Sequence, residues 1–314
     1  MPAATSTRTR RRRGSRGATC SPSAREPAIF CSARTSPIRP AYGSCGPVMA
    51  GVRNLHDAMT GYAPENLFAV AGKVALITGG GSGIGLMIAQ CLTANGARVY
   101  ICGRNAEKLE EAAGATGATA IAADISTLEG IEHVRRELGG REERLDILVN
   151  NAGTSWVSAI DEFPEHGWDK VLDLNAKAPF FLVKALLPLL SRQPDGAEWS
   201  SVVMISSARG MTAKASSVAY NVSKAALNHM TRVLAVGLAD HRISVNTIAP
   251  GWFETNLNRT ILRDRKDDLL SAQPIKRLGS AEDLSGAILF LCSRAGAYVT
   301  GHILPLDGGL VAAA

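Results

Sequence analysis

The stretch 73–85 constrains the fold of this chain more than any other. Residues 73–77 form a short apolar run typical of a buried parallel strand, the glycine-rich turn 78–85 follows directly, and a helical pattern continues to about Asn95. Glycines let the backbone approach a ligand, and a helix N-terminus supplies free N–H groups and a positive dipole. This order predicts a site for a dinucleotide diphosphate. A merely flexible glycine loop is the alternative.

Strand-like and helical patterns alternate beyond this turn. Each gap between the first six strand-like runs contains a helical pattern. Such alternation predicts an α/β fold, a single Rossmann-type doubly wound parallel sheet with helices on both faces. The strand-like runs are 73–78, 97–102, 119–122, 145–149, 200–206, 242–248 and 302–304.

The positive charge of the chain is concentrated in its first part. Residues 1–57 contain ten arginines and two acidic residues, so their local charge is +8, and the remainder is −2 within a net charge of +6. The basic balance therefore gives no reason to expect nucleic-acid binding by the folded part. The 314 residues suffice for one large domain, which we place at 58–314.

Residues 1–57 are rich in Arg, Ser, Ala and Pro and show no apolar periodicity up to about Val48. We expect a disordered basic leader. Its composition fits an organelle transit peptide. Translation that begins at Met49 or Met59 is another explanation, and an arginine cluster that contacts acidic surfaces is a third. We expect a cytoplasmic protein, or an organelle protein if the leader is a transit peptide.

The second strand ends in Gly103-Arg104, where an NAD-specific protein would place an acidic residue for the ribose 2′-hydroxyl. Glycine leaves room there, and a guanidinium suits a 2′-phosphate through charge-assisted hydrogen bonds. We therefore predict NADP(H) as the preferred coenzyme, with NAD(H) possible. The alternative is a surface arginine that opens the next helix.

Polar and small residues end the next two strands. Asp124, followed by Ile125, could accept a hydrogen bond from an adenine amine or cap the next helix. Asn150-Asn151-Ala152-Gly153 would let the backbone pass close to a ligand, or form an ordinary turn.

Tyr220 and Lys224 are four residues apart on a predicted helix and therefore share one face. An ammonium about 4 Å from a phenol, at an effective dielectric near 20, favours phenolate by roughly 4 kcal/mol, which is about three pKa units. Ser207 closes a predicted strand and could bind the same substrate oxygen. Asn175 lies in a helical segment, where a buried, satisfied amide is the alternative to a catalytic role. For Tyr220 and Lys224, the alternative is a half-buried aromatic side chain beside a solvated lysine.

These residues together resemble the short-chain dehydrogenase/reductase family from about Phe68 to Gly309. The turn 78–85 matches the family's Thr-Gly-x-x-x-Gly-x-Gly, the Asn-Asn-Ala-Gly string matches another motif, and 250–255 looks like its Pro-Gly-x-x-x-Thr loop. Within the family, the strings 96–102, 144–151 and 152–156 look most like the NADPH-dependent β-ketoacyl reductases associated with rhamnolipid synthesis. The basic residue that NADP-dependent members often carry before the second motif glycine is replaced here by Ser82.

The resemblance implies a catalytic tetrad of Asn175, Ser207, Tyr220 and Lys224. Tyr220 would donate a proton to a reduced carbonyl, Lys224 would also bind the nicotinamide ribose, and Asn175 would hold a water. No metal is expected, because the coenzyme performs the difficult chemistry. The implied coenzyme-binding residues are Gly79, Gly81, Ser82, Gly83, Ile84, Gly85, Arg104, Asp124, Ile125, Asn151, Ala152, Gly153, Tyr220, Lys224, Pro250, Gly251 and Thr255.

The resemblance also implies a small carbonyl substrate, most simply a 3-oxoacyl thioester on acyl carrier protein or coenzyme A. Trp156 and Trp252 could line an apolar pocket or serve as structural anchors. The segment 256–278 contains six basic residues that could contact an acidic carrier protein, although interleaved acids favour a solvated helix face.

Three rival functions stay open at this point. They are a polyol, sugar-acid or steroid dehydrogenase on the same scaffold, a non-catalytic NADP(H)-binding regulator, and a nucleic-acid partner that acts through the leader. The family also implies a homotetramer or homodimer built on long helices near 176–191 and 217–240. The cysteine spacing makes no zinc site, and no apolar stretch is long enough for a membrane span.

Overall fold

The computed structural model describes residues 62–191, 199–256 and 258–314. The predicted leader at 1–57 lies outside the described residues. All seven predicted strands are present within one or two residues of their expected bounds and pair in parallel in one sheet of order β3-β2-β1-β4-β5-β6-β7. The strands are β1 (Val74–Thr78), β2 (Arg98–Gly103), β3 (Thr119–Ala122), β4 (Ile147–Asn150), β5 (Ser200–Ile205), β6 (Ile243–Pro250) and β7 (Ile303–Leu306).

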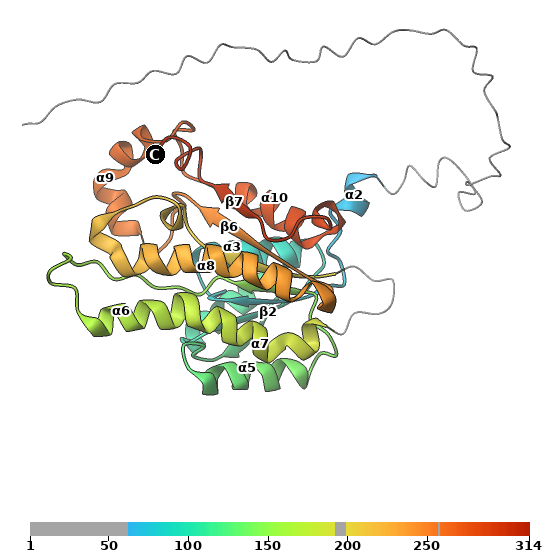
Figure 1. Cartoon of the computed structure of the whole chain (residues 1–314). Helices are drawn as coiled ribbons and strands as arrows, with labels where there is room; N and C mark the ends of the chain where they lie inside the picture. Colours follow the sequence, from blue (N-terminus) through green and yellow to red (C-terminus); the bar gives the residue numbers. More distant parts are fainter. Residues whose placement is uncertain (1–61, 192–198, 257) are drawn as a thin grey trace, which may run out of the picture. The chain divides into compact units, whose positions relative to one another are not determined.

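Helices fill the connections between the strands (Figure 1). The longer helices are α3 (Gly83–Ala94), α4 (Ala106–Thr116), α5 (Leu128–Gly139), α6 (Glu165–Leu172), α7 (Ala178–Leu190), α8 (Val218–Gly237), α9 (Arg259–Ser271) and α10 (Ala281–Cys292). The short elements are α2 (Pro64–Leu67), the π-helical turn η1 (Asp173–Lys177), and the 3-10 turns η2 (Ala208–Gly210), η3 (Ala215–Ser217), η4 (Ala239–His241) and η5 (Arg294–Gly296).

Each face of the sheet has its own hydrophobic core. Alternate side chains of β1 point to opposite faces, so Leu76 belongs to one cluster and Ile77 to the other. Helices α5, α7 and α8 cover the face of Leu76, and α3, α4 and α10 cover the face of Ile77. Figure 1 shows α7 and α8 on the same side of the sheet. The doubly wound α/β fold predicted from the alternating pattern is therefore confirmed.

The order of the strands also locates a crevice. The chain moves outward from β1 through β2 to β3, and then returns to pair β4 with the other edge of β1. In open parallel sheets, ligands bind outside the carboxyl ends of the strands where the order reverses. That point lies here at the ends of β1 and β4, which the sequence occupies with the glycine turn and with Asn151 to Gly153.

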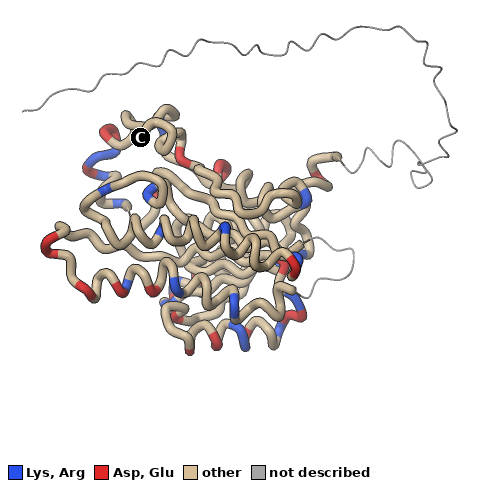
Figure 2. The backbone as a smooth tube through the Cα atoms, viewed as in Figure 1, with Lys and Arg blue, Asp and Glu red and all other residues tan. Residues whose placement is uncertain are grey.

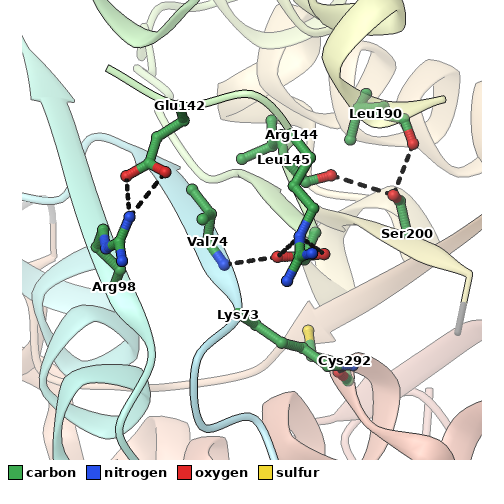
Figure 3. A network of polar contacts seen from close by, with 10 residues as sticks. Lys73, Val74, Arg98, Glu142, Arg144, Leu145, Leu190, Ser200 and Cys292 are labelled. Atoms are coloured by element: carbon green, nitrogen blue, oxygen red, sulfur yellow. Dashed lines mark hydrogen bonds and ion pairs between the residues drawn. The ribbon is translucent and has the colours of Figure 1, made fainter. Parts of the chain in front are cut away.

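A polar network joins the starts of the strands, at the end of the sheet opposite the crevice (Figure 3). The Asp146 carboxylate accepts a hydrogen bond from the backbone N–H of Val74 at 2.7 Å and ties the starts of β1 and β4. The Glu142 carboxylate accepts from the Arg98 guanidinium at 2.9 Å and from the Tyr100 hydroxyl at 2.7 Å. Burial, aided by this carboxylate, raises the pKa of Tyr100 to about 12. The hydroxyl therefore stays protonated and donates.

We expect Glu142→Ala to lower the free energy of unfolding by about 1–3 kcal/mol, because it leaves the buried Tyr100 hydroxyl without its acceptor. Urea denaturation of the purified protein measures this. The matched control is Glu137→Ala, which breaks an exposed i,i+4 pair with Arg141 and should change stability by no more than about 0.5 kcal/mol. Equal losses in the two variants would contradict the account of the network.

Candidate active site

The turn between β1 and α3 has the backbone shape that a diphosphate requires. Gly79 and Gly83 adopt left-handed conformations with φ of 67° and 54°. A Cβ on Gly85 would lie 2.3 Å from the carbonyl oxygen of Gly79, so only glycine fits. Ser82 is the N-cap of α3 and makes no side-chain hydrogen bond to the helix, which leaves the first-turn N–H groups available for an anion.

A clamp between the ends of β1 and β4 holds this turn in place. The Thr78 hydroxyl oxygen accepts hydrogen bonds from the backbone N–H groups of Asn151 and Ala152, both at 3.0 Å. The Asn151 amide in turn donates to the carbonyl oxygens of Thr78 at 2.9 Å and Gly79 at 3.2 Å. Asn151 therefore shapes the turn through its side chain. The sequence indicated Thr78 as part of a motif and gave no role for its hydroxyl.

The structure brings the two residues predicted at the adenine end together. Arg104 follows β2 directly, and its Nη1 lies 3.8 Å from the carboxylate of Asp124, which follows β3. Asp124 also accepts from the backbone N–H and the hydroxyl of Ser126. The alternative that it caps the next helix is wrong, because Thr127 caps α5. Ile125 is 5% exposed and packs in a core cluster. Its side chain therefore lies away from any ligand, and only its backbone could contact one.

Two cavities meet at the carboxyl edge of the sheet, and Tyr220 lines both. The first, about 220 Å³, adjoins the glycine turn and contains Gly79, Ala152, Lys224 and Thr255 in its lining. The second, about 330 Å³, is lined by Ser207 and by apolar residues that include Trp252. The phenol thus stands in the wall between a cavity beside the dinucleotide turn and a cavity large enough for a small molecule.

The predicted catalytic side chains converge on this wall from two elements. Ser207 directly follows β5, and Tyr220 and Lys224 lie on α8. Ser207 and Tyr220 are joined by a side-chain hydrogen bond. The Lys224 ammonium is buried, donates to the carbonyl oxygen of Ile205 at 2.8 Å, and lies 5.7 Å from the centre of the Tyr220 ring.

One sequence-based expectation needs correction. We expected Lys224 to lower the pKa of Tyr220, yet burial raises the pKa of Tyr220 in the free protein, and the smaller opposing effects come from the Ser207 hydroxyl and the Arg209 guanidinium. Burial likewise lowers the pKa of Lys224 to about 8. The expectation was wrong because it placed the ammonium beside the phenol at an effective dielectric near ~20. The folded chain instead directs the ammonium to the carbonyl oxygen of Ile205 and withdraws both groups from much of their contact with water.

Asn175 lies in the π-helical turn η1 and is fully buried. Its Oδ1 accepts from the Thr154 N–H at 2.8 Å, and its Nδ2 donates to the Thr154 carbonyl at 2.9 Å and to the Ser223 hydroxyl at 3.0 Å. The side chain therefore ties the segment after β4 to α8. The structure shows the buried, satisfied amide that was one of the two alternatives. These contacts assign it a positioning role, since its amide groups already have protein partners.

The loop after β6 approaches the glycine turn. A Cβ on Gly83 would lie 3.1 Å from the side chain of Thr255, so the two segments nearly touch. Both the backbone N–H and the hydroxyl of Thr255 donate to Oδ1 of Asn258, at 3.0 and 3.1 Å. Asn258 was missed in the sequence, although an asparagine three residues after the motif threonine is a typical turn-closing residue. Pro250 and Gly251 line the larger cavity.

The two tryptophans have different roles. Trp252 lines the larger cavity, as one of the two sequence alternatives predicted. Trp156 packs edge-on against His166 with ring centres 4.9 Å apart and also contacts Lys170 and Gly167, so it anchors α6. Nothing in the sequence distinguished them.

Arg209 in the larger cavity was also missed, because it belongs to no recognised motif. Its guanidinium lies 6.0 Å from the centre of a Trp252 ring. Burial lowers its pKa.

The six basic residues of the segment 256–278 are partly neutralised by its three acidic ones. Arg263 pairs with Asp264 and Arg265 with Asp268, which agrees with the solvated helix face weighed above. Within residues 62–191, 199–256 and 258–314, no group of three or more His, Cys, Asp or Glu residues is placed to hold a metal ion. A search of the described helices finds none with the length and apolar character that a membrane crossing requires.

Comparison with known proteins decides the family. The family model described as "Enoyl-(Acyl carrier protein) reductase" matches residues 79–311. The chain belongs to the short-chain dehydrogenase/reductase family. It is therefore an oxidoreductase of that family, as its motifs predicted.

The relatives of this short-chain dehydrogenase/reductase differ in their named substrates. One relative is the rhamnolipids biosynthesis 3-oxoacyl-[acyl-carrier-protein] reductase of Pseudomonas aeruginosa, to which this chain is 42% identical. The alignment covers 77% of this chain and 97% of the relative. Another relative is the gluconate 5-dehydrogenase of Gluconobacter oxydans, to which this chain is 33% identical. That alignment covers 78% of this chain and 97% of the relative. The structure titled Pseudomonas aeruginosa RhlG/NADP active-site complex matches it with a TM-score of 0.75 and 42% identity, covering 78% of this chain and 98% of that one.

Proposed function

We propose that this short-chain dehydrogenase/reductase uses NADPH to reduce a 3-oxoacyl thioester, carried on coenzyme A or acyl carrier protein, to the 3-hydroxyacyl product. The observation that carries the proposal is the position of Tyr220 in the wall shared by the two cavities. A phenol in that wall can reach a substrate carbonyl on one side while a nicotinamide lies on the other. The similarity to a 3-oxoacyl reductase supports the acyl class.

The residues of the smaller cavity fit a dinucleotide. The glycine turn offers backbone N–H groups without side chains in the way, and a guanidinium follows β2 where an acid would favour NAD(H). Arg104 lies 63% exposed, so it is available for a 2′-phosphate, and the NADP in a similar solved complex supports the same choice. When bound, the reduced coenzyme supplies the hydride. NAD(H) is the second coenzyme that the turn can hold.

The roles of the catalytic residues follow from their places. Ser207 and Tyr220 would hold the carbonyl oxygen of the substrate, and Oη of Tyr220 would give its proton to that oxygen as negative charge develops. A phenol whose pKa is raised stays protonated until the reaction begins, which suits a proton donor. Lys224 would bind the nicotinamide ribose through its ammonium. Asn175 would position Thr154 and Ser223 around them.

The lining of the larger cavity also supports an acyl substrate. Val157, Trp252, Ile261 and Leu310 provide apolar surface for a short chain. A sugar-acid carbonyl is the second candidate, because Arg209 and Lys214 line the same cavity and several relatives act on gluconate by name.

We also propose that the protein forms a homodimer or homotetramer. Helix α8 leaves Val233 and Val236 58% and 83% exposed, and Phe180 on α7 is also exposed. Exposed apolar side chains gathered on adjoining helices mark association surfaces. Light scattering should give a mass of two or four chains, and Val236→Lys should reduce it. A wild-type mass of one chain would overturn this proposal.

Tyr220→Phe should lower kcat/KM for acetoacetyl-coenzyme A by about 10²–10⁴-fold, because the proton donor is lost. Affinity for NADPH should be kept, since the ring remains. Steady-state assays with NADPH and a fluorescence titration measure the two quantities. Tyr298→Phe is the matched control, because Tyr298 is fully exposed and outside both cavities. Turnover retained by Tyr220→Phe would remove the mechanism.

Arg104→Asp should lower kcat/KM for NADPH by about tenfold to a hundredfold, since charge-assisted hydrogen bonds contribute about 1.5–3 kcal/mol. Preference should move toward NADH, because the new carboxylate repels a 2′-phosphate and accepts from a 2′-hydroxyl. Assays with both coenzymes measure the ratio. Arg136→Asp, an exposed position on α5, is the control. An unchanged ratio in Arg104→Asp would show that the end of β2 does not contact the 2′ position.

A further inference from the structure

Two basic side chains and no acidic one are among the described residues that line the larger cavity. Its cations are Arg209 and Lys214, and both are only partly exposed. Figure 2 shows that charges otherwise gather on the outer helices and are scarce in the central sheet. The complete lining is Ser155, Val157, Ser207, Ala208, Arg209, Lys214, Ser216, Ser217, Tyr220, Pro250, Gly251, Trp252, Asn258, Ile261 and Leu310.

Arg209 is held in the cavity by contacts that, among the described residues, occupy one of its five side-chain N–H donors. It lies in η2, two residues after Ser207, with its guanidinium over Trp252 at 6.0 Å. One donor, Nη1, reaches the Thr212 hydroxyl at 3.3 Å. No ion pair of Arg209 with a carboxylate occurs among the described residues. A guanidinium has five N–H donors in a fixed fork, so it can bind an anion through two parallel hydrogen bonds.

Lys214 adds a second positive charge to the same wall. Burial, together with repulsion by Arg209 and by Arg265 on α9, lowers the pKa of Lys214. Arg265 has a carboxylate partner in Asp268, at 3.6 Å, whereas neither cavity cation makes an ion pair in the described part of the chain. Partial burial and mutual repulsion disfavour these two cations in the free protein, and an anion bound to them would offset that cost.

We propose that Arg209 and Lys214 form an anion subsite of the substrate cavity, which binds a carboxylate or phosphate group of the carbonyl substrate. The inference rests on the proposed function, because it takes this cavity as the place where the carbonyl compound binds. The common chemistry is an anionic oxygen group. Its two sources are the carboxylate of an oxo acid and the phosphate of the pantetheine arm of a thioester.

The subsite also acts on the proton donor. The guanidinium of Arg209 lowers the pKa of Tyr220, against the larger effect of burial. An anion bound to Arg209 would neutralise that charge, so the pKa of the phenol would rise further. Substrate binding would then hold Tyr220 in the protonated form that donates to the developing alkoxide.

Calorimetry on the NADP⁺ complex of the full chain tests the subsite with two matched ligand pairs. D-gluconate is compared with neutral D-glucitol, and 4′-phosphopantetheine with neutral pantetheine. The charged member of at least one pair should bind about tenfold or more tightly than its neutral partner, as expected for a charge-assisted hydrogen bond of about 1.5–3 kcal/mol. Arg209→Met should abolish this advantage, Arg209→Lys should keep part of it, and Arg136→Met should keep all of it.

The outcomes separate the two sources of charge and separate this inference from the proposed function. Loss of advantage for gluconate supports a carboxylate, and loss for phosphopantetheine supports a phosphate. The inference is overturned if neither charged ligand outbinds its partner in the wild type, or if the advantage survives in Arg209→Met or in Lys214→Met. These measurements need no turnover, so failure to reduce 3-oxoacyl thioesters would refute the proposed function alone. If Arg209→Met fails to bind NADP⁺, Arg209→Lys and Lys214→Met decide the result.

Discussion

Burial of the Tyr220 phenol in the wall between two cavities is the constraint on which the site depends. Removing a phenol from water disfavours its charged form, so the hydroxyl remains protonated in the free protein. The same position gives it access to both cavities. Two neighbours oppose the effect of burial on the pKa of this phenol, Ser207 through its hydroxyl and Arg209 through its positive charge.

The scaffold provides that position through the reversal of strand order between β1 and β4. Asn151 and Thr78 join the ends of these strands and fix the glycine turn, while Asn175 ties the segment after β4 to α8. Helix α8 supplies both Tyr220 and Lys224. The two cavities therefore share a wall made of elements that hydrogen bonds join to one another.

Much of this arrangement could be predicted from the sequence. The strand, glycine turn and helix at 73–95 have local signatures. Parallel strands place their carboxyl ends at one side of the sheet, so the convergence of Arg104 with Asp124 follows. The direction of the Lys224 ammonium could not be predicted, because it depends on the carbonyl of Ile205 across a packed interface. The role of Arg209 could not be predicted for a similar reason. Its importance comes from the lack of acids among the described lining residues, which several separate segments between Ser155 and Leu310 supply.

The pKa of Tyr220, obtained from the ultraviolet difference spectrum of wild type and Tyr220→Phe between pH 8 and 11, tests this account most directly. Free tyrosine ionises near ~10. In the coenzyme-free protein, the account predicts that the phenol contributes less than half of its phenolate absorbance at pH 10, because burial dominates. An ionisation already complete below pH 9 in the free protein would contradict it, since the phenol would then be acidified by its neighbours before any ligand binds.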